Sequence, residues 1–355
     1  MYNIYSVEIK RILASKKYLF IILLLMTFKV IYICMNMSLD DNKINESIYK
    51  NYMEELSGVY NSEKHTYIDE TIKYYREAQK NYSMYQAKYI NGDIDLETYR
   101  YHRTEKELGD ARVPVLTIIQ TKANYFKTSY NDGEFFYDLD VTNFIDKSDI
   151  DFFAYAITFA IVSLLFLSDY SNGTKMLVYA SRYGRSHINT VRLNLAVVMS
   201  VIIATILQVT EIATFMVTSD KGDLSAPIRS IMSYSMAVDI SVIEYIVLVA
   251  ITRILFIACA AVIMAALTMV IHKFIPLLVT AIIIVLIPMA VESYVPTTVL
   301  NLFIHRGLSA SDMYLMPHKI GSVYNFVVTG GVYIVIATVL YVVTTREKRM
   351  VDSIS

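Results

Sequence analysis

Residues 18–37 read YLFIILLLMTFKVIYICMNM, a run in which Lys29 is the only charged side chain. A helix of about 20 apolar residues crosses a hydrocarbon core about 30 Å thick. Five further apolar stretches follow, at 150–167, 193–217, 242–271, 274–291 and 323–343. The sequence therefore predicts an all-α integral membrane protein with six transmembrane helices.

The composition agrees with a membrane protein. Of the 355 residues, 55% are hydrophobic and only 18% are charged, whereas an average soluble domain has about 25% charged residues. The formal net charge is −1, so the chain offers no basic excess for a nucleic-acid partner. The expected surroundings of most of its surface are the lipid bilayer.

Basic residues occur in every second connecting segment. They cluster at 10–17, before the first span, at 175–192, between the second and third spans, at 272–273 and at 346–349, after the last span. Short loops rich in Lys and Arg stay in the cytoplasm. We therefore expect a multi-pass protein of the cell membrane with both termini cytoplasmic, a tail at 346–355 and residues 38–149 outside.

The polar block at 38–149 has the pattern of a folded helical domain. Its side chains recur at alternating spacings of four and three, as in the seam of a supercoil, at Ile68, Ile72, Tyr75, Gln79, Tyr82, Gln86 and Tyr89. Asn91-Gly92-Asp93 interrupts this helix, Asp95 is placed to cap a second one, and helical spacing continues to Pro114. We predict a helical hairpin within an extracellular domain.

Tyrosines are concentrated in the same block, which holds 14 of the chain's 29. They are either aromatic platforms for a ligand or amphipathic side chains that fill a thin core while their hydroxyls stay hydrated. The thin core is the favoured interpretation.

Motifs for catalysis and metal binding are absent from the sequence. It has no G-x-x-x-x-G-K-[ST] phosphate loop, so the chain is not expected to be an ATPase of that kind. H-E-x-x-H, C-x-x-C and G-x-S-x-G are missing, and the six histidines are scattered. We expect no catalytic residue, no bound metal and no cofactor in this chain.

The segment at 168–189, between the second and third spans, carries the sharpest local signal. Asp169 is followed by the pair Gly173-Thr174, by a short apolar run and by a basic stretch with Arg182 and Arg185. This order resembles a loop of the permease subunits of type-2 ATP-binding-cassette (ABC) exporters. The alternative is that these basic residues only set topology and anchor lipid headgroups.

The resemblance implies a coupling loop that docks on a separate ABC ATPase subunit through Asp169, Gly173, Thr174, Arg182 and Arg185. That partner would hydrolyse ATP with Mg, and a second permease copy or paralogue would complete the transporter. Residues 1–17 resemble the family's amphipathic connecting helix, and 292–324 its extracellular re-entrant segment. Asp169 stands where Glu is commoner, and the outer block is larger than in compact members.

An extracellular domain between the first two spans marks a subgroup of this family, and the resemblance implies export of an amphipathic substrate such as a peptide, an antibiotic or another membrane-active compound. The alternative function is a receptor or scaffold that presents the outer helical domain and transports nothing. An associated ATPase would distinguish the two.

Three charges stand out within the predicted spans: Lys29, Glu211 and Arg253. Each costs at least about 2.5 kcal/mol at the centre of an isolated helix. We expect them to pair with one another or to line a translocation pathway. The alternative is that Lys29 and Arg253 extend towards the headgroups while Glu211 lies near the interface.

Overall fold

The computed structural model of the chain describes residues 2–38, 45–146, 151–171, 173, 187–219, 222–231, 240–291, 294–296, 299, 303–310, 313–314, 319–320 and 323–346. The fold divides into two compact units. The first, here called the bundle unit, comprises Met1–Ser38, Phe144–Thr218 and Ile246–Ser355. The second, the hairpin unit, comprises Leu39–Asn143 and Ser219–Tyr245.

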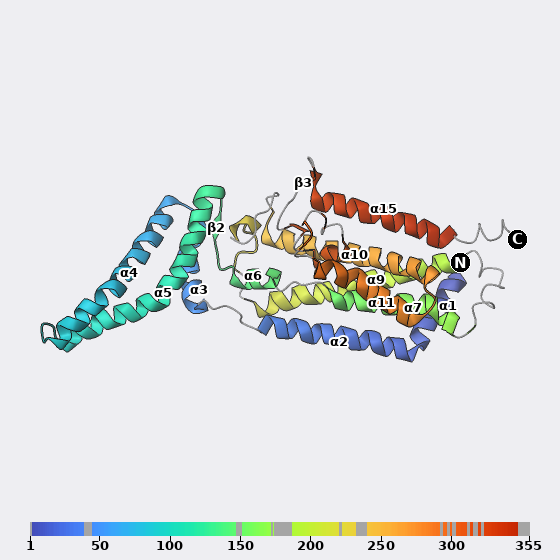
Figure 1. Cartoon of the computed structure of the whole chain (residues 1–355), viewed down its shortest axis with the longest axis horizontal. Helices are drawn as coiled ribbons and strands as arrows, with labels where there is room; N and C mark the ends of the chain where they lie inside the picture. The colour runs from blue at the N-terminus through green and yellow to red at the C-terminus, as the bar shows by residue number, and fades with distance from the viewer. Residues whose placement is uncertain are drawn as a thin grey trace. The chain divides into compact units, whose positions relative to one another are not determined.

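The bundle unit consists of apolar helices. They are α1 (Tyr2–Ala14), α2 (Lys16–Ser38), α7 (Phe152–Ser171), α9 (Ile188–Thr218), α10 (Val242–Val270), α11 (Phe274–Ala290), α13 (Ile304–Ser309) and α15 (Asn325–Arg346). Figure 1 shows the long members running alongside one another. Short strands β3 (Lys319–Ile320) and β4 (Val323–Tyr324) pair just before α15.

Five of these helices, α2, α7, α9, α10 and α15, are long and apolar enough to cross a membrane. The prediction of an all-α membrane protein agrees with this architecture. The predicted fifth span corresponds to α11, whose 17 residues extend about 26 Å. That is less than the hydrocarbon thickness of about 30 Å, so the count of six spans stays a prediction.

Burial separates the central helix from the peripheral ones. Helix α7 is buried over most of its length, whereas α2 and α15 expose most of their apolar side chains. An apolar surface without a protein partner is the surface that lipid solvates. The centre of the bundle unit is therefore α7, which packs against both α2 and α9.

The hairpin unit is built on two long helices, α4 (Ser62–Ile90) and α5 (Leu96–Ser129). Asn61 and Asp95 cap them, because each side chain accepts a hydrogen bond from a backbone N–H three residues on. Gly92, at φ +81°, provides the turn between them. The predicted hairpin is present, and its location outside the cell stays a prediction.

The predicted end of the second hairpin helix at Pro114 is wrong, because α5 continues through this residue to Ser129. A proline inside a helix removes one hydrogen bond and bends the axis without always ending the helix. Helix α5 does change direction along its length (Figure 1). Packing of Val115, Leu116 and Ile119 in the core stabilises the part beyond the proline.

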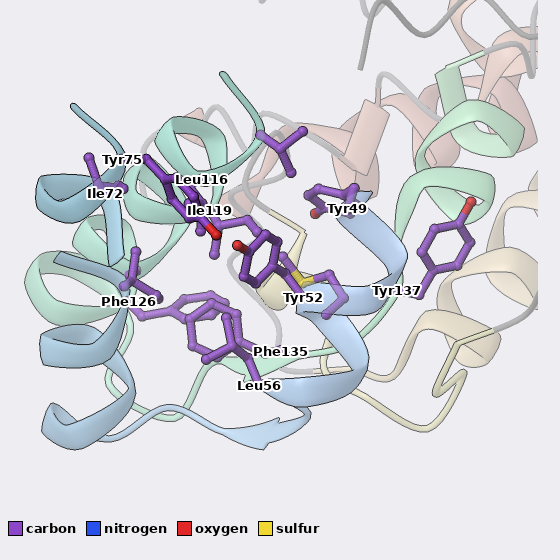
Figure 2. Close-up of a cluster of buried hydrophobic side chains, with 14 residues drawn as sticks. Tyr49, Tyr52, Leu56, Ile72, Tyr75, Leu116, Ile119, Phe126, Phe135 and Tyr137 are labelled. Carbon is purple, nitrogen blue, oxygen red and sulfur yellow. The ribbon is translucent and has the colours of Figure 1, made fainter. Parts of the chain in front are cut away.

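A third helix and a small sheet complete this unit. They are α3 (Glu46–Glu55), the antiparallel strands β1 (Gly58–Val59) and β2 (Glu134–Phe135), α6 (Leu139–Asp146) and the 3₁₀ turn η1 (Ile228–Ser230). Figure 2 shows the core, to which α3 contributes Tyr52 and Leu56, α4 contributes Tyr75, and α5 contributes Phe126. Some of the tyrosines of this unit therefore fill a thin core.

Residues 219–245 were not predicted to belong with the 38–149 block, yet they are part of the hairpin unit. The hydroxyl of Ser230 accepts a 2.9 Å hydrogen bond from the backbone N–H of Glu134. A Cβ on Gly222 would lie 2.1 Å from the carbonyl oxygen of Tyr137, so only glycine permits this approach. The connection between the third and fourth predicted spans is thus a structural element of the unit.

Candidate functional site

The bundle unit contains two groups of buried ion pairs. The first, here called the ion-pair ring, consists of Glu8 and Arg11 of α1, Asp169 of α7 and Arg192 of α9. Arg192 lies 2.6 Å from Asp169 and 2.9 Å from Glu8. Arg11 lies 2.7 Å from the other oxygen of Asp169 and 3.4 Å from Glu8. Each guanidinium contacts both carboxylates, so four charges form a closed, neutral ring.

The sequence brings these side chains together through helix geometry. Glu8 and Arg11 are three residues apart and therefore lie on one face of α1, while Asp169 lies in the last turn of α7 and Arg192 in the second turn of α9. Glu8, Asp169 and Arg192 are almost fully buried. The ring consequently ties the amphipathic α1 to both helices that enter and leave the segment 172–186.

The second group, here called the ion-pair row, consists of Asp151, Lys29, Glu211 and Arg253. The ammonium of Lys29 lies 3.6 Å from Asp151 and 3.0 Å from Glu211. The other oxygen of Glu211 lies 3.6 Å from Arg253. The four charges again sum to zero, but they form an open sequence with two ends.

Neutral partners occupy the ends of the row. Asp151 caps α7 by accepting a 3.0 Å hydrogen bond from the N–H of Ala154, and it also accepts one of 3.0 Å from the amide of Gln208. At the other end, Nε of Arg253 donates to the carbonyl oxygen of Ser309 in α13, at 3.0 Å. The row therefore links α2, α7, α9, α10 and α13.

Helix α13 is held tightly at this end. A Cβ on Gly307 would lie 1.9 Å from the ring of Phe256 in α10, so only glycine permits the contact. The hydroxyls of Thr252 and Tyr314 lie 2.6 Å apart and add a second link to α10. Any displacement of Arg253 thus affects the position of α13.

The two groups lie at opposite ends of α7. Asp151 precedes its first turn and Asp169 lies in its last turn, and 18 residues of helix extend about 27 Å. This distance is close to the hydrocarbon thickness of about 30 Å. Asp151 of the row and Asp169 of the ring are therefore separated by about the length of helix that crosses a membrane.

The structure brings together all three predicted pathway residues. Lys29, Glu211 and Arg253 are paired and almost fully buried. Sequence reasoning missed Asp151 and Gln208. A signal for Gln208 existed, because it lies three residues before Glu211 and hence on the same helix face.

The predicted docking residues are placed only in part. Asp169 belongs to the ion-pair ring, and Gly173 adopts a left-handed turn at φ +66° with its surface exposed. Thr174, Arg182 and Arg185 lie outside the described residues. Contact of this set with an ATPase stays a prediction, and the role of Asp169 inside the bundle unit is an additional finding.

Among the described residues, no three His, Cys, Asp or Glu side chains are arranged to hold a metal ion. The acidic groups of the bundle unit are instead neutralised by Lys and Arg. The arrangement can hold helices together and can exchange ion-pair partners, which are mechanical functions. Comparison of the chain with protein-family models, with curated proteins and with solved structures finds no match.

Proposed function

We propose that this chain is the permease subunit of an ABC exporter, a multi-pass membrane protein with both termini in the cytoplasm and the hairpin unit outside. Separate cytoplasmic ATPase subunits bind and hydrolyse ATP with Mg, and a second permease copy or paralogue completes the pathway. The exported substrate is an amphipathic compound such as a peptide or an antibiotic.

The observation that carries this proposal is the ion-pair ring. The basic segment 172–186 begins where Asp169 is held by Arg11 and ends just before Arg192, which contacts Glu8. A force applied to this segment acts on α7, α9 and α1 together. Amphipathic α1 therefore moves with the two helices, as a device that couples a cytoplasmic ATPase to a membrane bundle requires.

The ion-pair row supplies the element that changes state. ATP-driven closure of a partner moves an equilibrium only if the partner binds one permease conformation better than the other. Separation of α9 from α2 or α10 exchanges the partners of Glu211 while the total charge of the row stays zero. Opening at this end then needs no external counter-ion.

Charge reversal in the loop tests the proposal. Arg182→Glu combined with Arg185→Glu should release the ATPase and abolish ATP-coupled transport, since reversal adds repulsion to the lost attraction. Insertion should persist because Lys175 and Arg192 remain. The measurements are the amount of ATPase that copurifies and transport into inverted vesicles.

A matched control reverses two basic residues of the tail, Lys348→Glu with Arg349→Glu, and should retain the partner. Retention of a stoichiometric ATPase and full transport by the loop variant would contradict the coupling role. If no ATPase copurifies with the unaltered chain, the receptor or scaffold alternative replaces the transporter.

A further inference from the structure

The α4–α5 hairpin has two different faces on either side of its seam. One face, here called the aromatic face, is formed by Tyr67, Tyr74 and Tyr85 of α4 and by Tyr101, Glu105 and Leu108 of α5. The hydroxyl of Tyr74 donates a 2.6 Å hydrogen bond to Glu105 across the two helices. Helical spacing of seven and eleven residues places the three α4 tyrosines in one line.

The side chains on the opposite side of the seam are polar or charged, and they pair with one another. Gln120 donates to Asp69 at 2.6 Å, Gln79 donates to Asp110 at 2.9 Å, and Lys106 contacts Asp110 as well. These pairs are hydrated and internally matched, so that side resembles an ordinary soluble helix surface. On the aromatic face Tyr74 and Tyr101 stay exposed, whereas the ring of Tyr85 stacks on that of His102.

The base of the aromatic face is already covered by an amphipathic helix of the same chain. Tyr67 donates a 2.7 Å hydrogen bond to Glu55 at the end of α3, and Tyr52 and Met53 of α3 are buried in the core. Burial and the bond to Glu55 raise the pKa of Tyr67 to about 12, so this hydroxyl remains a donor at neutral pH. Helix α3 thus shows which kind of element fits this face.

Above α3 the same face continues uncovered. Tyr74 and Tyr101 are 50% and 57% exposed. From Tyr74 to Tyr85 the face extends about 16 Å, which matches three turns of a docked helix. Large exposed aromatic groups are typical of binding surfaces rather than of solvated ones.

We propose that the uncovered part of the aromatic face binds an amphipathic, cationic helix of a peptide substrate. The face continues the surface that α3 already contacts through Glu55 and through its buried Tyr52 and Met53. The carboxylate of Glu105 and the tyrosine rings both attract a cation, and Lys88 already lies 5.7 Å above the ring of Tyr85. That the bound peptide is the exported substrate rests on the proposed function, whereas the docking itself does not.

The test uses the full chain in nanodiscs of zwitterionic phosphatidylcholine and needs no ATPase. The probe is a fluorescent 18-residue Leu/Lys peptide designed as an amphipathic helix, with a Leu/Glu counterpart as the charge control. Anisotropy titrations, corrected with empty nanodiscs, give the dissociation constants. We expect the Leu/Lys peptide to bind and the Leu/Glu peptide not to.

Substitutions then locate the site. Tyr74→Ser with Tyr101→Ser should weaken binding at least about tenfold, while the Phe versions of both changes, which keep the rings, should retain most of it. The matched variant of the charged side, Lys73→Ser with Lys80→Ser, should not weaken binding. All four positions are on the hairpin surface, and circular dichroism checks that helicity is unchanged.

The proposal is overturned if neither peptide binds, if both bind equally, or if the two serine pairs have equal effects. It is also overturned if Tyr74→Ser with Tyr101→Ser dissociates a dimer of this chain, because a second copy would then occupy the face. If the Leu/Lys peptide binds but no ATPase copurifies, the docking proposal stands and the proposed transporter function fails. If an ATPase copurifies but the peptide does not bind, the proposed transporter function stands and the docking proposal fails.

Discussion

The ion-pair ring and the ion-pair row contain the same charges, two acidic and two basic, and both are buried among apolar helices. They differ in connectivity. In the ring each charge has two opposite neighbours, at distances from 2.6 to 3.4 Å. In the row, the ion pairs among the described residues give two opposite neighbours to Lys29 and Glu211 only, and two of these three contacts measure 3.6 Å.

This difference teaches how a single bundle can be rigid at one end and adjustable at the other. Opening a closed ring separates at least two ion pairs at once in a medium of low dielectric constant, where each is costly to separate. An open row can lose one contact while its end residues keep Gln208 or the carbonyl of Ser309. We therefore interpret the ring as a clamp and the row as the switching element.

The largest effect is expected from breaking the ring. Arg192→Gln removes the guanidinium that joins Glu8 to Asp169 and leaves two buried carboxylates with Arg11 alone. Such an uncompensated charge lowers the free energy of unfolding by about 3–5 kcal/mol. Thermal unfolding of the purified chain in detergent measures this loss.

The control for the ring is Arg103→Gln in the hairpin unit, which breaks an exposed pair with Glu107 at 2.8 Å. Exposed pairs contribute little to stability, so its unfolding should match that of the unaltered chain. Equal shifts for Arg192→Gln and Arg103→Gln would show that the ring is not a clamp.

Breaking the row should lower stability less than breaking the ring does, but it should impair transport more. Glu211→Gln leaves Lys29 with Asp151 and removes the carboxylate that lies 3.6 Å from Arg253, at a cost of about 3 kcal/mol. Because Glu211 joins the two halves of the row, transport should fall at least about tenfold. Substrate accumulation in inverted vesicles measures it.

Glu244→Gln is the matched control for this change. Glu244 accepts a 2.8 Å hydrogen bond from the N–H of Ser241, whose hydroxyl accepts one of 3.4 Å in return. Glutamine preserves this capping box, so transport should be unaffected. If both glutamine variants transport equally well, the row has no part in switching.

The sequence predicted those features that burial energy dictates. Apolar runs of membrane length specify helices, and the cost of an isolated charge requires Lys29, Glu211 and Arg253 to find partners. The seam from Ile68 to Tyr89 predicted the hairpin because a supercoil buries residues at that spacing, although only its first three members, Ile68, Ile72 and Tyr75, are buried. These inferences need no knowledge of tertiary contacts.

Apart from Gln208, which lies within α9, the residues missed by sequence reasoning lie outside the centres of the predicted spans. Asp151, Glu8, Arg11 and Arg192 are all next to segments where water or lipid headgroups are the default partners, and basic residues there also set topology. Their pairing depends on how α1, α7 and α9 pack, and a one-dimensional pattern does not contain this packing. The stretch 222–231 was missed because it contains only the short 3₁₀ turn η1 and so has no helical or strand period.

The tyrosines of the hairpin unit divide into buried and exposed side chains, so the thin-core interpretation holds for only part of them. Tyr49, Tyr52 and Tyr75 fill the core, whereas Tyr74 and Tyr101 are exposed. Adjacent residues, Tyr74 and Tyr75, have opposite roles because a single residue step rotates the side chain about 100° around a helix. Composition alone does not distinguish them.

The smallest effect on stability is expected in the hairpin unit. There a buried ion pair, Lys122 with Asp138, has a neutral third partner, the hydroxyl of Tyr49. Asp138 accepts hydrogen bonds from Lys122, at 2.6 Å, and from the hydroxyl of Tyr49, at 2.7 Å. Tyr49→Phe removes one bond to a charged acceptor but leaves the ion pair intact. The free energy of unfolding should fall by about 1.5 kcal/mol, less than in the ring or the row.

The pH dependence of this change identifies its cause. Burial, together with the carboxylate of Asp138, raises the pKa of Tyr49 well above its usual value. The folded chain therefore keeps this proton when the unfolded chain loses it near pH 10. The stabilisation by Tyr49 is fully present below that pH and decreases as the pH rises above it. Unfolding of both proteins from pH 8 to 11 should show their difference shrinking above pH 10, and a constant difference would mean that Tyr49 is not held as a buried donor.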